Sequence, residues 1–147
     1  MIVLDSDHVS VLQFPESAKA ETLRDRLAAA GDVTISTTAV TIEEQTRGWL
    51  AAIRSAKEVS HQVPFYDRLV GLFDFFAEWN IVPFDDMAAE KFTELRRQGI
   101  RIGSMDLKIA SIALVHQATV LSRNLKDFQQ VPGLSVEDWL EDSNEEF

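Results

Sequence analysis

Short apolar runs alternate with longer amphipathic stretches along this chain of 147 residues. The runs at residues 2–4, 33–36, 81–84 and 119–121 are typical of buried strands, and a last short strand or extended piece is expected near residues 134–136. Such alternation implies right-handed crossovers and a parallel sheet with helices on both faces. We therefore expect an α/β fold, a three-layer α/β/α sandwich with a parallel sheet of four to five strands.

The stretches between these runs carry helix signals. Helices are expected at residues 15–30, 41–59, 65–79, 86–98 and 105–116. The first should open after Pro15, the fourth should end at Gly99, and Ser104 should cap the last. The aromatic stretch at residues 65–79 is more typical of core packing or subunit contact than of a cofactor site. The segment SRNLKDF reads as a polar turn.

Four carboxylates sit where a strand is about to end or a helix has just begun. Asp5 closes the first strand, Asp127 follows the fourth, and Glu44 and Asp106 lie near helix starts. The ends of parallel strands meet at one edge of a sheet, so these acids can converge on a metal site. The helix dipole should keep Asp106 ionised. Magnesium suits such a set because it prefers oxygen ligands and retains several waters.

Several segments resemble the PIN-domain family, and within it the VapC-type toxins of toxin–antitoxin pairs. They are the opening IVLDSDHVSVL, the middle ISTTAVTIEEQTRG and, as the most specific pieces, IGSMDLKIASIAL and LSRNLKDFQQVPGL. The resemblance runs from residue 2 to residue 139 and is weakest at residues 49–79. It implies a PIN-like fold and divides the chain into a PIN domain at 1–140 and an acidic tail at 141–147.

The resemblance also implies the site residues. It makes Asp5, Glu44, Asp106 and Asp127 the four catalytic acids, with Asp5, Asp106 and Asp127 as metal ligands. Glu43 competes with Glu44 for the second position, and Gly48 favours Glu44 because it matches the family's spacing.

Residues beside these acids are candidates for the surroundings of the metal. Asn124 could share the last position with Asp127. The family commonly has Thr-Asn after the first acid, whereas this chain has Ser6-Asp7. Ser6 is thus a possible hydrogen-bond donor, and Asp7 is either an extra ligand or a solvent-facing residue.

The implied reaction is hydrolysis of RNA phosphodiester bonds with Mg²⁺ or Mn²⁺. Arg101, Arg123 and Lys126 would hold the RNA backbone without reading bases. The implied partners are an RNA substrate, a cognate antitoxin and a second copy in a homodimer. The aromatic stretch at 65–79 is a candidate contact for either protein partner, or plain core. Structural roles are expected for the three histidines, His8, His61 and His116.

The charge of the chain is compatible with an RNA partner once its distribution is considered. The net charge is −10, but six acids and no bases fall at 128–147, which leaves 18 acids and 14 bases elsewhere. Setting the four candidate acids aside leaves 14 acids and 14 bases. Residues 91–126 are locally basic, with seven Lys or Arg and two acids. Alternatively, these bases lie on solvated helix faces.

The composition narrows the class of site and the compartment. The chain has no cysteine, which excludes disulfides, thiolate metal sites and thiol nucleophiles. Its opening has no basic segment or apolar stretch of the kind found in signal peptides, so a cytoplasmic location without a membrane span is expected. Two alternatives to the ribonuclease stay open: a catalytically silent PIN-like module that binds RNA or an antitoxin, and a DNA-directed phosphodiesterase.

Overall fold

The computed structural model describes residues 1–141, which form five strands and seven helices. The strands are β1 (Ile2–Leu4), β2 (Ile35–Thr38), β3 (Asn80–Val82), β4 (Thr119–Leu121) and β5 (Ser135–Glu137). The helices are α1 (Ser6–Leu12), α2 (Ala18–Ala29), α3 (Ala39–Ser55), α4 (Val59–Phe76), α5 (Asp86–Arg97), α6 (Ser104–Val115) and α7 (Leu125–Phe128).

The strands form one sheet in the order β3-β2-β1-β4-β5, and every neighbouring pair is parallel. Leu4 at the end of β1 lies opposite Leu121 at the end of β4. The expected parallel sheet is therefore confirmed, with five strands. Its central strand is β1, so the loop that follows Leu4 opens at the middle of the carboxyl edge, where ligands bind in open α/β sheets.

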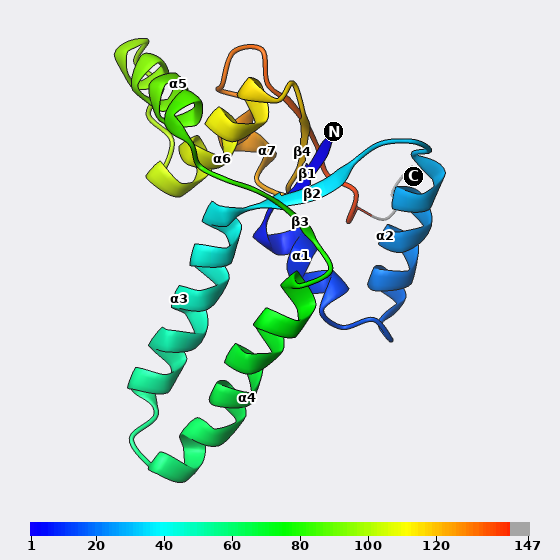
Figure 1. Ribbon diagram of the computed structural model, residues 1–147, viewed down its shortest axis with the longest axis vertical. Helices are drawn as coiled ribbons and strands as arrows, with labels where there is room; N and C mark the ends of the chain where they lie inside the picture. The colour runs from blue at the N-terminus through cyan, green and yellow to red at the C-terminus, as the bar shows by residue number, and fades with distance from the viewer. Residues whose placement is uncertain (142–147) are drawn as a thin grey trace.

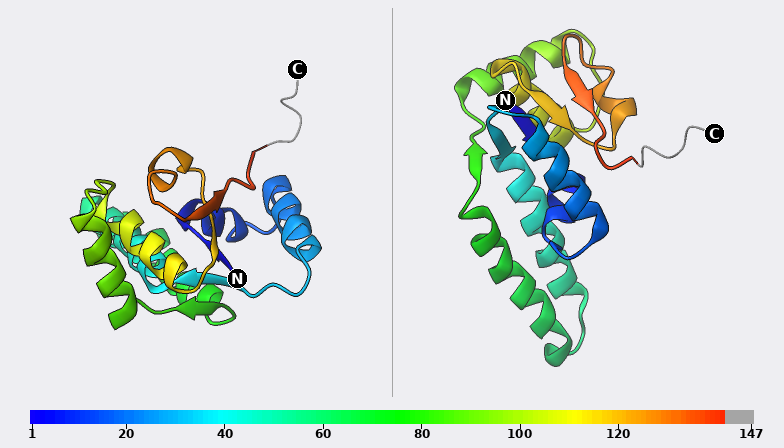
Figure 2. Two further views of the ribbon diagram at one scale, coloured as in Figure 1. Left: turned by 90° about the horizontal axis from the view of Figure 1, so that it is seen from above. Right: turned by 90° about the vertical axis from the view of Figure 1, so that its right-hand side faces the viewer.

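Two cores lie on opposite faces of the sheet, because successive strand residues point to opposite sides. Val3 and Val120 pack with α5 and α6 on one face. Ile2 and Leu4 pack on the other face with α1 and α4, where Leu72 and Phe76 belong to α4. These cores give the three-layer arrangement expected from the sequence, which Figures 1 and 2 show from three sides.

Helices α3 and α4 form a long antiparallel pair that projects from the body of the molecule (Figure 1). Their rings meet where Trp49 stacks on Phe65, with centroids 6.2 Å apart. The aromatic stretch expected at residues 65–79 is split by this packing: Leu72 and Phe76 are buried, whereas Val70 and Phe73 are 62% and 72% exposed. The stretch thus supplies part of a core and also an exposed apolar face.

Two element starts differ from the sequence expectation. The helix expected from residue 15 begins at Ala18, because the Ser17 hydroxyl accepts the Ala20 N–H at 3.2 Å and caps it. Pro15 lies in the turn before it. Strand β2 starts at Ile35, two residues later than expected, and the Thr37 hydroxyl donates to the Leu4 carbonyl oxygen at 3.0 Å.

The expected cap at Ser104 is wrong. Gly103 is the N-cap of α6, and Ser104 is the first helical residue, where its hydroxyl oxygen lies 3.4 Å from the Arg96 guanidinium. The helix expected at 41–59 spans Ala39–Ser55, and the one expected at 65–79 spans Val59–Phe76. The polar turn SRNLKDF contains the short helix α7.

None of the helices within residues 1–141 combines the length and apolar character needed to cross a bilayer. Of the tail expected at 141–147, residues 142–147 lie outside the part of the chain described here. The domain division at residue 140 stays a prediction.

Candidate metal centre

Asp5 lies at the centre of the carboxyl edge, directly after β1. It is the N-cap of α1, and its Oδ1 accepts the Ser6 N–H at 2.7 Å. Its other oxygen accepts the Ser122 hydroxyl at 2.8 Å. The side chain is only 6% exposed, so this carboxylate is held in one orientation.

Glu44 and Asp106 join Asp5 from two other elements. Glu44 lies in the second turn of α3, and Asp106 is the third residue of α6. One oxygen from each of Asp5, Glu44 and Asp106 lies within 4.8 Å of the other two. Oxygens on a shared Mg²⁺ are about 3 to 4 Å apart, since its bonds are about 2 Å long. Small side-chain movements would therefore allow these three acids to share one ion.

The three carboxylates are hard to ionise together without a cation. Burial, and then the charge of Asp7, raises the pKa of Asp5 from 3.8 to about 6. Burial, and then the charges of Asp5 and Asp106, raises the pKa of Glu44 from 4.5 to about 7. A bound divalent cation reverses this effect, because it stabilises the charged form of every ligand.

The helix dipole expected to keep Asp106 ionised is opposed by the surroundings of this carboxylate. Burial raises the pKa of Asp106, whereas the hydrogen bond from Asn124 lowers it. The charges of Asp127 and Asp7 also raise it. Burial and like charges therefore act against the effect of the dipole at this position.

Two buried polar atoms of the site have no partner with hydrogen-bond geometry among residues 1–141. They are the Ser6 hydroxyl oxygen and the Oε1 of Glu44. Buried polar atoms are normally hydrogen-bonded, and leaving one unpaired costs about 1–3 kcal/mol. A hydrated cation between the carboxylates would supply both with partners, so the residues present fit a Mg²⁺-like ion.

A polar network joins the loop after β4 to the cluster. The Ser122 hydroxyl donates to Asp5 and accepts the Asn124 N–H at 3.0 Å. The Asn124 amide donates to Asp106 Oδ2 at 2.8 Å and to Asp127 Oδ2 at 3.0 Å. Sequence reasoning missed Ser122, although its place at the end of a strand, beside the turn with Asn124, was a usable signal.

Asp127 accepts a hydrogen bond from the Asn124 amide and lies outside the three-residue cluster. Its role as a metal ligand stays a prediction, and a contact through Asn124 or water fits the geometry. Between the two candidates for the second acid, the structure favours Glu44, since Glu43 pairs with Arg47 at 2.9 Å.

Asp7 lies outside the three-residue cluster and is held by contacts on both of its oxygens. Its Oδ2 accepts the Arg123 backbone N–H at 2.8 Å, and its Oδ1 lies 2.6 Å from His8 Nδ1. His8 is fully buried, and its Nε2 accepts the Trp139 N–H at 3.1 Å, so Nδ1 carries the proton toward Asp7. Burial favours a raised pKa for Asp7, but hydrogen bonds from His8 and Arg123 hold its pKa below the usual value. Asp7 thus ties α1 to the loop after β4.

The other candidates lie at the surface. Arg101, Arg123 and Lys126 are exposed, as are His61 and His116. Arg96, from the same basic stretch, instead donates to the Ile100 and Ile102 carbonyl oxygens, both at 2.9 Å, and holds the loop before α6. The basic stretch therefore contains residues with structural roles and exposed residues, of which Arg101 also donates to the Arg96 carbonyl oxygen at 3.3 Å.

Comparison with known families and sequences gives a consistent picture. A family model described as PIN domain matches residues 2–134. Ribonuclease VapC2 of Rickettsia felis is 45% identical over 47 residues, which are 32% of this chain and 35% of that protein. The tRNA(fMet)-specific endonuclease VapC of Salmonella typhimurium is 32% identical over 69 residues, or 44% and 52% of the two chains. The matches thus span only about a third to a half of these curated relatives.

Solved structures share the fold at low identity. VapBC2 from Rickettsia felis, bound to a promoter DNA fragment, has a TM-score of 0.66 at 24% identity and covers 95% of this chain and 99% of that one. VapBC-1 from nontypeable Haemophilus influenzae has a TM-score of 0.69 at 19% identity, with 96% and 100% coverage. At such identities the likeness establishes the fold alone.

Proposed function

Since the chain belongs to the PIN domain family, we propose that it is a divalent-metal-dependent endoribonuclease, the toxin of a type II toxin–antitoxin pair. The observation that carries the proposal is the convergence of Asp5, Glu44 and Asp106 oxygens to within 4.8 Å at the carboxyl edge of the sheet. The relatives named as a ribonuclease and as a tRNA endonuclease support RNA as the substrate.

The residues of the cluster divide into ligands and supports. We assign Asp5, Glu44 and Asp106 to the metal, with Asp127 contributing through water or through Asn124. Mg²⁺ or Mn²⁺, when bound, polarises the scissile phosphate and lowers the pKa of a water molecule. Ser122 and Asn124 fix the orientation of Asp5 and Asp106, and the Ser6 hydroxyl can donate to Glu44 or to a phosphate oxygen. Arg101, Arg123 and Lys126 hold the strand by its phosphates.

The partners follow from the neighbours. VapBC-5 from Mycobacterium tuberculosis, a solved structure of the same fold, is named as a member of a family of toxin–antitoxin systems. We propose an antitoxin and a homodimer for this chain as well. A cytoplasmic location is part of the same proposal, since the RNA substrate is found there. The exposed side of α4 is available for either protein contact.

Cleavage assays with matched variants test the activity. Wild-type protein is incubated with a panel of structured RNAs and with DNA of the same sequences, with Mg²⁺, Mn²⁺ or excess chelator. We expect RNA cleavage that requires the metal and is lost in Asp5→Asn and Asp106→Asn, because each change removes a ligand charge at nearly constant size. Asp25→Asn, at an exposed position of α2, is the matched control and should cleave like wild type.

Three outcomes would reject the proposal. Full activity in chelator would show that no metal is required. Equal activity of the cluster variants and wild type would show that the acidic cluster is not the active site. Tight RNA binding without turnover under any divalent ion would identify a silent binding module, and cleavage confined to DNA a DNA-directed enzyme.

A further inference from the structure

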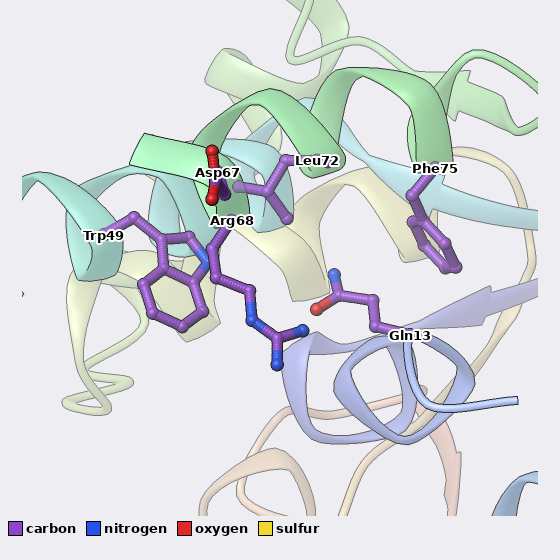
Figure 3. A pocket seen from close by; sticks show the side chains of 7 residues that line it. Gln13, Trp49, Asp67, Arg68, Leu72 and Phe75 are labelled. Atoms are coloured by element: carbon purple, nitrogen blue, oxygen red, sulfur yellow. The ribbon is translucent and has the colours of Figure 1, made fainter. Parts of the chain in front are cut away.

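A groove runs beside the acidic cluster, between α1, α3 and α4. It consists of two hollows of about 430 and 340 Å³ that share Gln13 and Trp49. We call it the α1–α3–α4 groove and define it by six lining residues: Gln13, Glu44, Gly48, Trp49, Arg68 and Gly71. Figure 3 shows Arg68 and Gln13 reaching into the second hollow from α4 and from the end of α1.

The groove is continuous with the metal centre through Glu44. This residue lines the larger hollow and also supplies an oxygen to the acidic cluster. Trp49 follows five residues later on α3, which places it about 7.5 Å further along the helix axis. A strand whose phosphate lies on the cluster would therefore bring its next nucleotide to the groove.

Two glycines of the groove lie inside helices, where glycine is destabilising relative to alanine. Gly48 belongs to α3 and Gly71 to α4, and a Cβ atom built on either would meet nothing within 4 Å. Packing of the described chain therefore does not require glycine at these positions. Close approach of a ligand to both helices would explain them, because only glycine leaves the helix surface bare.

The side chains around these glycines match the chemistry of a nucleotide. The half-buried Trp49 ring is held by stacking on Phe65 and offers an aromatic surface to a base. The Arg68 guanidinium lies 5.0 Å from the centre of the Phe14 ring and forms no ion pair within residues 1–141. The Gln13 amide donates to Gln45 Oε1 at 3.1 Å, and the Gln45 amide donates to the Ser10 hydroxyl at 3.0 Å, so the Oε1 of Gln13 can bond a base edge.

We propose that the α1–α3–α4 groove binds a single-stranded nucleobase of the RNA, adjacent to the scissile phosphate. Trp49 stacks on the base, Gln13 bonds its edge, and Arg68 pairs with the neighbouring phosphate. The proposal rests on the proposed ribonuclease function and adds to it a site that selects the base next to the cut. A peptide of a partner protein is the competing occupant, but the opening of the groove onto the metal centre and the unpaired Arg68 favour RNA.

A substitution that fills the groove without disturbing the fold tests whether the groove binds a nucleobase. Gly48→Leu places a side chain in the larger hollow, and Ala51→Leu, at an exposed position of the same helix outside the groove, is the matched control. Cleavage of a random-sequence single-stranded RNA library with Mg²⁺ gives KM, kcat and the base preference beside the cut. For Gly48→Leu we expect KM to rise about tenfold or more, as for a lost stacking contact, with kcat nearly unchanged and a flattened base preference. Ala51→Leu should match wild type, and thermal unfolding should show both variants folded.

A second variant and a binding assay keep the test independent of packing at α3. Arg68→Gln should weaken binding of labelled RNA to the inactive Asp106→Asn protein and reduce its salt dependence. An oligonucleotide with one abasic position should bind the Asp106→Asn protein more weakly than the intact oligonucleotide does. The two oligonucleotides should bind the Gly48→Leu, Asp106→Asn double variant equally, because its groove is already filled.

The outcomes separate the two proposals. If wild type cleaves RNA but Gly48→Leu keeps the wild-type KM and base preference, the nucleobase site is rejected and the ribonuclease stands. If Gly48→Leu instead loses only the binding of a protein partner, the groove is a protein-docking surface and the inference is also rejected. If wild type cleaves no RNA with any metal, the proposed function itself fails first.

Discussion

At the scale of single residues, position along the chain and the family resemblance indicated four acids, of which three lie together and Asp127 lies outside their cluster. Neither indicated how these acids are supported. Asp5, Glu44 and Asp106 could be found because each lies at the end of a strand or the start of a helix, and the sheet brings such places together. The contacts that Ser122 and Asp7 make could not be predicted, because they join residues more than 100 positions apart. The upward shift of the pKa of Asp106 could not be predicted, because burial cannot be read from one helix.

The raised pKa values of Asp5 and Glu44 give a stability prediction. Both groups bind protons more tightly in the folded chain than at their model values of 3.8 and 4.5, so between about pH 4 and 7 the folded state holds more protons. The metal-free protein should therefore lose stability as pH rises through this window. Thermal unfolding in chelator from pH 4.5 to 8 measures this. The fall should be smaller in Glu44→Gln, and an equal fall in that variant would contradict the assignment.

Asp7 should contribute to stability as an anchor. Asp7→Ala removes the acceptor for the Arg123 N–H and leaves the buried His8 Nδ1–H unpaired, so we expect a loss of about 1–3 kcal/mol in urea unfolding. Asp7→Asn keeps an acceptor oxygen and should lose less. Asp25→Ala, on the exposed side of α2, is the control and should stay within about 0.5 kcal/mol of wild type. If Asp7→Ala were as stable as wild type, the contacts of Asp7 would not be needed for stability.

At the scale of elements, periodicity predicted the strands and helices α2 to α6, but not the short helices α1 and α7. Local competition between caps decided where the helices begin. Pro15 and Ser17 both offer a start for α2, and the structure uses Ser17 because its hydroxyl reaches the Ala20 N–H. Ser104 has the residue type of a cap, but Gly103 takes that place and Ser104 faces Arg96. Which candidate caps a helix depends on the chain before it. The starts of α2 and α6 therefore could not be predicted from residue type.

The two serines give a paired test of these helix starts. Ser17→Ala should lower the free energy of unfolding by about 1 kcal/mol, because it removes the side-chain cap of α2. Ser104→Ala should change it by less than about 0.5 kcal/mol, since that hydroxyl caps no N–H group. Chemical denaturation of the two variants measures the difference. The reverse order of losses would favour the sequence expectation over the structure.

At the scale of the whole molecule, the sheet order joins sequence-distant segments into one site. The alternation of strands and helices predicted a parallel sheet, and the structure confirms it with five strands. The order β3-β2-β1-β4-β5 could not be derived, because it is set by packing between segments far apart in the chain. That order places Asp5 between the elements that carry Glu44 and Asp106, so three separate elements share one cluster of negative charge.

Metal binding should therefore stabilise the whole fold. A cation that binds only the folded chain adds about 2.7 kcal/mol when its free concentration is 100 times its Kd. We expect Mg²⁺ or Mn²⁺ to raise the Tm of wild type, and to raise it more at pH 8 than at pH 5, because protons compete for Asp5 and Glu44. The shift should vanish in Asp106→Asn and persist in Asp25→Asn. A shift of equal size in Asp106→Asn would point to a different binding site.

The most direct measurement is the position of bound Mn²⁺ in anomalous diffraction from crystals soaked with the ion. The structure predicts a peak at bonding distance, about 2 Å, from oxygens of Asp5, Glu44 and Asp106. No peak among these three carboxylates at saturating Mn²⁺ and pH 8, or peaks only elsewhere on the surface, would contradict the account.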